Sequence, residues 1–157
     1  MAWSNSKVFM ATIEDVFENT TAFDANADTF KAALYDNDIT PDQTVASANT
    51  AYNAGQWASA GNEVSDGTEW DAAGEPLTSV TSAFSSNVYT FDAADTPSGG
   101  SSATLANVYG CLVYDDTLAA PVADQGISFH YFGGANSVVD GTFTIVWHSS
   151  GIFSATA

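Results

Sequence analysis

Residues 127–153, ISFHYFGGANSVVDGTFTIVWHSSGIF, contain two strand-like runs joined by a turn-rich segment. Large apolar and polar residues alternate in the runs 127–132 and 142–148, and this period of two is typical of a half-buried strand. The link between them includes Gly133 and Gly134, which tolerate turn geometry. We therefore predict a β-hairpin at the centre of an antiparallel β domain.

Further strand-like segments lie on both sides of this stretch. They are residues 29–35, 77–84, 88–91, 104–114 and 151–155. The run 104–114, TLANVYGCLVY, is apolar on both faces and predicts a central, doubly covered strand, while PSGGSS at 97–102 predicts a turn. Seven or eight short strands separated by turn residues favour an antiparallel β-sandwich or jelly-roll-like domain.

The segment between residues 43 and 70 is rich in Ala, Asn, Ser and Gly and has no clear period. A connection of this length without structure is uncommon in a compact domain. We expect short irregular pieces that carry Tyr52 and Trp57 against the sheet.

The N-terminal residues predict a helix from Ser6 to Asn19 with Ser4 or Ser6 as N-cap. Its apolar residues fall at helical spacing, and this stripe either packs on the β domain or docks against a neighbouring subunit. The chain divides into an N-terminal helical segment, 1–22, and a β-sandwich domain, 23–157. The candidate interface residues are Trp3, Phe9, Ile13, Val16 and Phe17.

The charge balance excludes several partners. The chain has 19 acidic residues, two lysines and no arginine, for a formal net charge of -17. Binding to a phosphate backbone depends on Lys and Arg, so we predict no nucleic-acid partner. Acidic residues scattered over the whole chain suit a surface that molar salt screens, and we predict a salt-loving source.

No targeting or membrane-spanning segment is apparent in the sequence, and we expect a soluble protein that is not exported. Cys111, the only cysteine, cannot form an internal disulfide, and its apolar neighbours predict a buried small residue. A Cys111–His130 or Cys111–His148 pair is formally available, as is a two-histidine metal site. The apolar setting of the thiol and the lack of a third ligand argue against both.

A calcium-loop pattern begins at DANAD, residues 24–28, but does not continue. The sixth position is Thr29 where the loop needs Gly, and the twelfth is Tyr35 where it needs a bidentate Glu. A weak cation site completed by other acidic loops, such as Asp115 and Asp116, stays open. We assign no metal ligand, no cofactor and no catalytic residue.

Aromatic residues offer one more binding chemistry. Tyr52, Trp57 and Trp70 could form a sugar-stacking platform, although aromatic residues in β proteins more often pack in the core.

Five segments resemble a family of small structural proteins encoded by tailed viruses of bacteria and archaea. They are KVFMATIEDVF (7–17), ADTFKAALYDNDITPD (27–42), ANTAYNAGQW (48–57) followed by NEV (62–64), VYGCLVYDDTLAAPVADQGISFHYFGG (108–134) and DGTFTIVWHSSGIF (140–153). They occur in order over most of the chain. The resemblance implies a β-rich virion protein without enzymatic activity, and the acidity looks like a version from a virus of a halophilic host.

On this basis we expect a capsid decoration or turret protein, a symmetric homo-oligomer on the head of a tailed virus. Its partners would be the major capsid protein and copies of itself, with no nucleic acid and no membrane, and it would be assembled in the host cytoplasm into the virion. The alternative is a tail-tip or fibre component that binds a host surface glycan or S-layer. A hydrolase is disfavoured because no nucleophile and base are recognisable.

Overall fold

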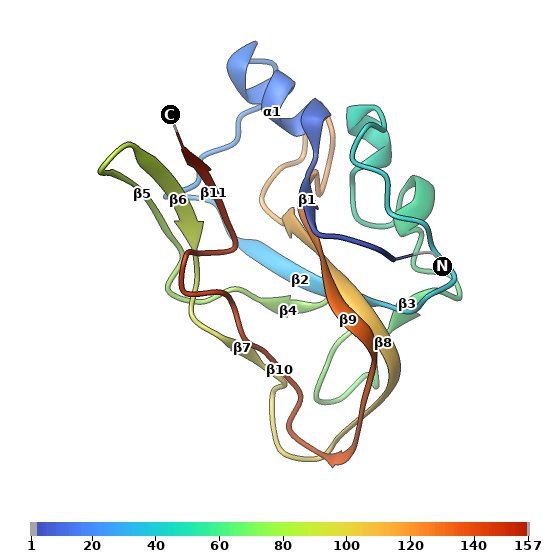
Figure 1. The fold of residues 1–157 in the computed structure, drawn as a ribbon. Coiled ribbons are helices and arrows are strands. Elements are labelled where there is room, and N and C mark those ends of the chain that lie inside the picture. The colour runs from blue at the N-terminus through green and yellow to red at the C-terminus, as the bar shows by residue number, and fades with distance from the viewer. Residues whose placement is uncertain (1–2, 157) are drawn as a thin grey trace.

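The computed structural model describes residues 3–156, which form a mainly β, antiparallel protein with one short α-helix in that range (Figure 1). This confirms the predicted class and the presence of an N-terminal helix. The largest sheet has six strands in the order β1-β9-β8-β2-β3, with β4 also paired to β2. Its members are β1 (Lys7–Val8), β9 (Gly126–Gly141), β8 (Ala103–Asp115), β2 (Phe30–Tyr35), β3 (Glu63–Val64) and β4 (Glu75–Pro76).

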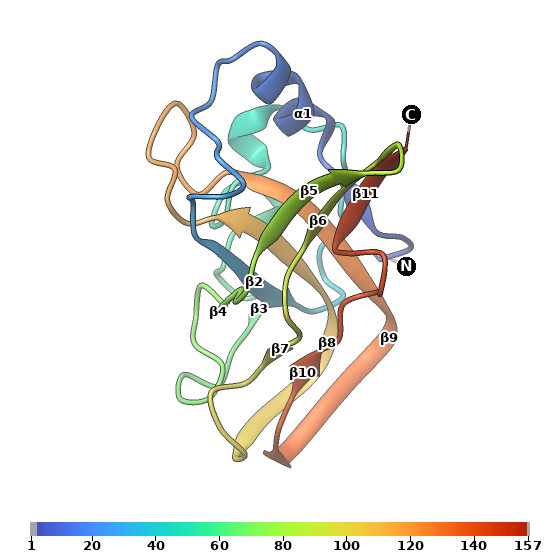
Figure 2. The ribbon, with the colours of Figure 1, turned by 90° about the vertical axis from the view of Figure 1, so that its left-hand side faces the viewer.

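Two smaller sheets complete the β structure. One has three strands in the order β11-β6-β5, and the other pairs β10 with β7. These strands are β5 (Thr81–Ser85), β6 (Val88–Asp92), β7 (Thr96–Pro97), β10 (Thr144–Ile145) and β11 (Phe153–Thr156). Figure 2 shows β5, β6 and β11 in front of the long strands β8 and β9.

The predicted hairpin between residues 127–132 and 142–148 is wrong. Instead, β9 continues through the turn-rich segment to Gly141 and pairs along its length with β8, and the second run contributes only the short β10. The reason is a bulge: Val108 pairs with Asn136 and Gly110 with Tyr131, so β9 carries extra residues between these pairs. The glycines of this segment, with positive φ, bend the strand without reversing it.

Strands β2 and β8 follow the prediction closely, and β8 lies inside the sheet between β9 and β2. On β2, Phe30 and Leu34 enter one hydrophobic core and Tyr35 enters another on the opposite face, as the alternation predicts. On β8, Leu112 and Val113 are divided between the same two cores. Covering on both faces explains why the sequence of β8 is apolar throughout its second half.

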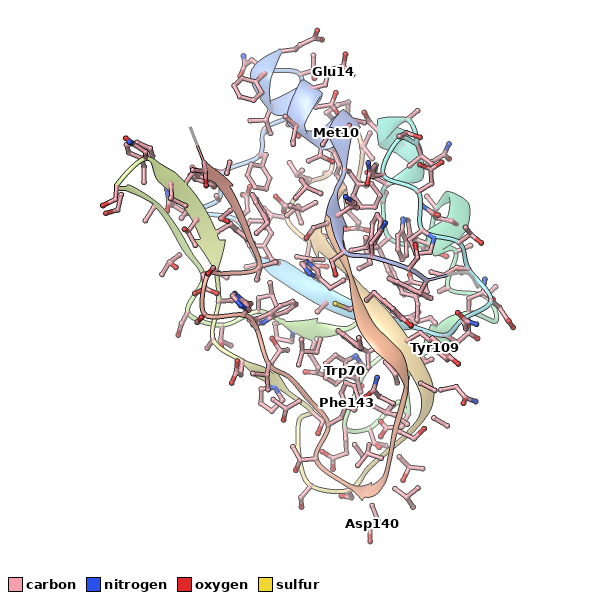
Figure 3. All side chains as sticks on the ribbon, viewed as in Figure 1. Met10, Glu14, Trp70, Tyr109, Asp140 and Phe143 are labelled. Carbon is pink, nitrogen blue, oxygen red and sulfur yellow. The ribbon has the colours of Figure 1, made fainter. Side chains whose placement is uncertain are left out.

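The first core is shared by the large sheet and the two smaller ones. The rings of Phe30 on β2 and Phe91 on β6 meet edge to face with their centroids 5.1 Å apart. Trp70, in the loop before β4, contacts Phe143 in the same way at 5.6 Å, and Figure 3 shows these two side chains inside the molecule.

The second core lies on the other face and is dominated by aromatic rings. Trp57 follows the predicted irregular segment, which forms two 3-10 turns, η1 (Ser47–Asn49) and η2 (Gly55–Trp57). Its ring contacts Trp3, Phe9 and Tyr35 with centroid distances of 5.1 to 6.0 Å. The expectation that this segment carries Tyr52 and Trp57 against the sheet is confirmed, since Tyr52 stacks on Tyr114 of β8 at 5.0 Å.

Helix α1 (Met10–Phe17) is shorter than the predicted Ser6–Asn19. Neither Ser4 nor Ser6 is its N-cap: Phe9 occupies that position, and the Ser6 hydroxyl accepts a hydrogen bond from the Tyr131 N–H. The predicted first turn is a strand because the edge of β9 offers unpaired backbone groups, and Phe9 N–H donates to the Ile127 carbonyl at 3.0 Å. The predicted end at Asn19 agrees with its left-handed φ of 55°.

Candidate interaction surface

Helix α1 is attached to the protein by polar groups and leaves apolar side chains outside. The Thr12 hydroxyl donates to the Gly126 carbonyl, and the Met10 N–H donates to the Gln43 carbonyl at 3.1 Å. Ile13 is 38% exposed, Val16 43% and Phe17 85%. An amphipathic helix normally turns its apolar face inward, so this exposed stripe is unusual for a surface that contacts only water.

The stripe forms one wall of a groove of about 430 Å³. Side chains of the three-stranded sheet form the opposite wall, and both walls lie at the end of the molecule where α1, β6 and β11 come together (Figures 1 and 2). The lining residues are Val8, Thr12, Ile13, Val16, Phe17, Tyr89, Ile127, Phe153 and Ala155. None of these residues is charged, although the chain carries a net charge of -17.

The five predicted interface residues are divided between two environments. Trp3 and Phe9 are completely buried in the second core of the same chain. The Trp3 indole N–H donates to the Asp36 carbonyl at 2.6 Å, so this residue anchors the N-terminal segment to the domain. The other three, Ile13, Val16 and Phe17, remain available to a partner and line the groove.

Sequence reasoning missed the second wall of the groove. Tyr89 comes from β6 and Phe153 and Ala155 from β11, far from the helix along the chain. Their signal was the alternation of β11, which places Phe153 and Ala155 on one face. Only the antiparallel pairing of β11 with β6 brings Tyr89 beside them, with Ala155 opposite Tyr89 in the register.

The candidate Cys-His pair has an inert environment. Cys111 and His130 face each other across β8 and β9, but the thiol is fully buried, and burial raises its pKa. Burial lowers the pKa of His130 to about 4. Its Nε2 lies 2.9 Å from the Ser128 hydroxyl, which is itself buried. A neutral thiol beside a neutral imidazole is a poor nucleophile pair.

His148 lies elsewhere, in an exposed turn where its Nδ1 accepts the Ser150 N–H at 3.1 Å. Within residues 3–156, no three His, Cys, Asp or Glu side chains are grouped closely enough to hold a metal ion by themselves. In the same range, no helix has the length and apolar character needed to cross a membrane.

The three aromatic residues considered for sugar stacking do not form an exposed platform. Trp57 and Trp70 are fully buried and belong to different cores. Tyr52 is half-buried, and its hydroxyl donates to Glu63 at 2.9 Å.

A different aromatic depression exists between β9 and β10, with a volume of about 380 Å³. Tyr131, Phe132 and Phe143 contribute to its lining, together with Asn136.

Searches of protein-family models, of curated proteins and of solved structures found no match to this chain.

Proposed function

We propose that this chain is a virion structural protein, a capsid decoration or turret protein that forms a symmetric oligomer on the head of a tailed virus. The observation that carries the proposal is the uncharged groove between α1 and the β6–β11 strands. Its exposed Ile13, Val16 and Phe17 offer apolar area for contact with protein, which is what a decoration protein needs to strengthen a shell.

The fold proposed with this function is a β-sandwich of the jelly-roll type. It is supported by the first core, to which the six-stranded and three-stranded sheets both contribute side chains. The paired Phe30 and Phe91 are examples from the two sheets. Such a rigid body presents loops and edges to neighbours without a moving part.

Self-association through the groove is consistent with the charge of the chain. Two copies that each carry a charge of -17 repel one another, and only an uncharged surface brings them together without opposing carboxylates. A symmetric contact uses the same patch on each copy, so Phe17 of one copy would enter the groove of the next. A salt-loving viral host would supply the screening that the rest of the surface needs.

The oligomer is tested by sedimentation velocity and light scattering of the wild type, Phe17→Ser and Val139→Ser in molar NaCl. Val139 is a matched control, because it is 80% exposed and does not line the groove. Loss of one buried Phe contact costs about 2 to 3 kcal/mol, so Phe17→Ser should weaken association about 30-fold to 100-fold. Val139→Ser should associate like the wild type.

A monomeric wild type, or equal behaviour of the two variants, contradicts the use of the groove for self-association. The virion role is tested separately by mass spectrometry and image reconstruction of particles of the virus that encodes the chain. We expect density for this protein on the outer head surface, with the local symmetry of its oligomer. Its absence from purified particles would refute the virion role.

The alternative, a tail-tip or fibre component that binds a host glycan or S-layer, is favoured by the aromatic depression between β9 and β10. Sugar rings stack on aromatic faces such as those of Tyr131 and Phe143, and the Asn136 amide could hydrogen-bond hydroxyl groups. Glycan-array binding that Phe143→Ala abolishes, together with density at the tail tip, would favour this alternative.

A further inference from the structure

Two carboxyl groups meet where β2 begins and β8 ends. Asp115 is the last residue of β8, pairs with Phe30 in the sheet register and is fully buried. Its Oδ1 accepts hydrogen bonds from the N–H groups of Thr117 at 2.9 Å and Leu118 at 3.2 Å. Its Oδ2 is also buried and has no hydrogen-bond partner among the described residues. The carboxyl group of Asp28 lies beside it.

The loops that supply these two groups are held in place. Asp28 Oδ2 accepts the Asp24 N–H at 2.6 Å, and Asp24 Oδ1 accepts the Asn26 N–H at 3.0 Å, so DANAD is a compact turn. Thr29 N–H donates to the Thr117 hydroxyl at 2.8 Å and joins this turn to the β8–β9 loop. The two loops lie side by side in Figure 2, and the carboxyl groups are therefore brought together before any ligand binds.

No cationic side chain of the described residues neutralises this pair. Lys31 forms an ion pair with Asp116 at 3.2 Å, and it is opposite Tyr114 in the register, on the other face of the sheet from Asp115. Lys7 pairs with Phe129 at the β1 edge of the sheet, and the chain has no arginine. Two adjacent carboxylates, one of them buried, require a proton or an external cation.

Neutral oxygens in the same region suit a hard cation. The Gln125 carbonyl accepts the Asp115 N–H at 3.0 Å, and the side-chain Oε1 of Gln125 is buried without a hydrogen-bond partner among the described residues. The Thr29 and Thr117 hydroxyls lie 2.9 Å apart between the two loops. Calcium prefers carboxylate, carbonyl and hydroxyl oxygens and accepts water for its remaining positions.

We propose that Asp28 and Asp115 bind a divalent cation of the calcium class. The DANAD turn fails as an EF-hand loop because Tyr35 occupies the position of the bidentate Glu. Asp115, delivered by β8, supplies the missing carboxylate from a distant part of the chain. With two carboxylates and otherwise neutral ligands, the affinity falls in the range of extracellular calcium modules, about 10⁻⁴ to 10⁻³ M. The bound ion links the loop after α1 to the loop after β8.

The test is a calcium titration of the full chain at pH 8 in molar NaCl, which suppresses diffuse binding to the acidic surface. Calorimetry and thermal unfolding are measured with CaCl₂ and, at equal ionic strength, MgCl₂, for the wild type, Asp28→Asn and Asp140→Asn. Asp140 is exposed at the opposite end of the molecule (Figure 3) and is the charge-matched control. We expect one saturable calcium site in the wild type and Asp140→Asn, and at least a tenfold loss of affinity in Asp28→Asn.

Amide NMR of the wild type keeps the test valid if Asp28→Asn does not fold. Calcium should shift the Thr117 and Leu118 amide signals, which report on the Asp115 carboxylate, at concentrations where magnesium leaves them unchanged. Equal calcium responses in all three proteins, or shifts spread over the acidic surface, would mean diffuse ion binding and overturn the proposal. So would a wild type that ignores calcium but loses stability as the pH rises through 7, because the pair would then hold a proton.

Discussion

Replacement of Asp115 by asparagine removes a buried negative charge with almost no change of shape. The amide oxygen of Asn can accept the same Thr117 and Leu118 N–H groups, and its NH₂ group can donate to Asp28. Burial, together with the adjacent Asp28 carboxyl group, raises the pKa of Asp115 from an ordinary 3.8 to about 7. The variant should therefore respond to pH differently from the wild type when calcium is removed by a chelator.

The sign follows from the order in which the two states lose their proton. Between pH 4 and 7 the unfolded chain has lost the Asp115 proton while the folded protein retains it, so the free energy of unfolding of the wild type falls as the pH rises. Below that window both states are protonated, and above it both are ionised and the cost is fully present. The shift corresponds to at most about 4 kcal/mol of lost stability at pH 8.

The assay is urea unfolding, followed by circular dichroism, from pH 4 to pH 8 in molar NaCl with chelator. Groups with lowered pKa, such as Asp66, whose pKa hydrogen bonds from backbone N–H groups hold well below its usual value, change stability in the opposite direction. They act equally in both proteins and cancel in the difference. We expect Asp115→Asn to gain stability over the wild type as the pH rises, by up to about 4 kcal/mol at pH 8. Asp116→Asn, which removes the neighbouring charge on Lys31, is the control and should show no such gain.

Parallel pH profiles for the wild type and Asp115→Asn would refute this reasoning. They would mean that Asp115 is ionised in the folded protein over the whole range, and that its buried charge has a partner other than a proton.

Three further predictions concern packing and charge. Gly110→Ala should destabilise the protein by roughly 1 to 3 kcal/mol or more in urea unfolding, because an added Cβ would lie 2.3 Å from the His130 carbonyl oxygen and 2.6 Å from the Trp3 ring; unchanged stability would contradict this close approach. Trp57→Ala should cost about 3 to 5 kcal/mol and remove near-UV dichroism from the second core, whereas an equally stable variant would show that this core is not tightly packed. Lowering NaCl from molar concentration to about 0.1 M should expand or dissociate the protein, because the screening length grows to about 10 Å; circular dichroism and sedimentation that do not change with salt would contradict the inferred adaptation to salt.

Short-range patterns in the sequence determined much of the fold. The alternation of Phe30, Ala32 and Leu34 predicted β2 and its inward face, and the run 104–114, apolar on both sides, predicted a central strand. These predictions succeed because side-chain direction alternates along any strand, whatever its partner. The absence of arginine and the net charge of -17 likewise need no coordinates to argue against a phosphate-backbone partner.

The partner of each strand was decided only by the tertiary structure. Turn residues such as Gly133 and Gly134 are equally compatible with a hairpin and with a bulge, and long-range pairing with β8 selects the bulge. The groove and the acidic pair depend on the same pairing. Tyr89 meets α1 only because β6 packs across the large sheet, and Asp115 meets Asp28 only because β8 and β2 run antiparallel in one register. Contacts of this kind join residues far apart in the chain, and no local periodicity records them.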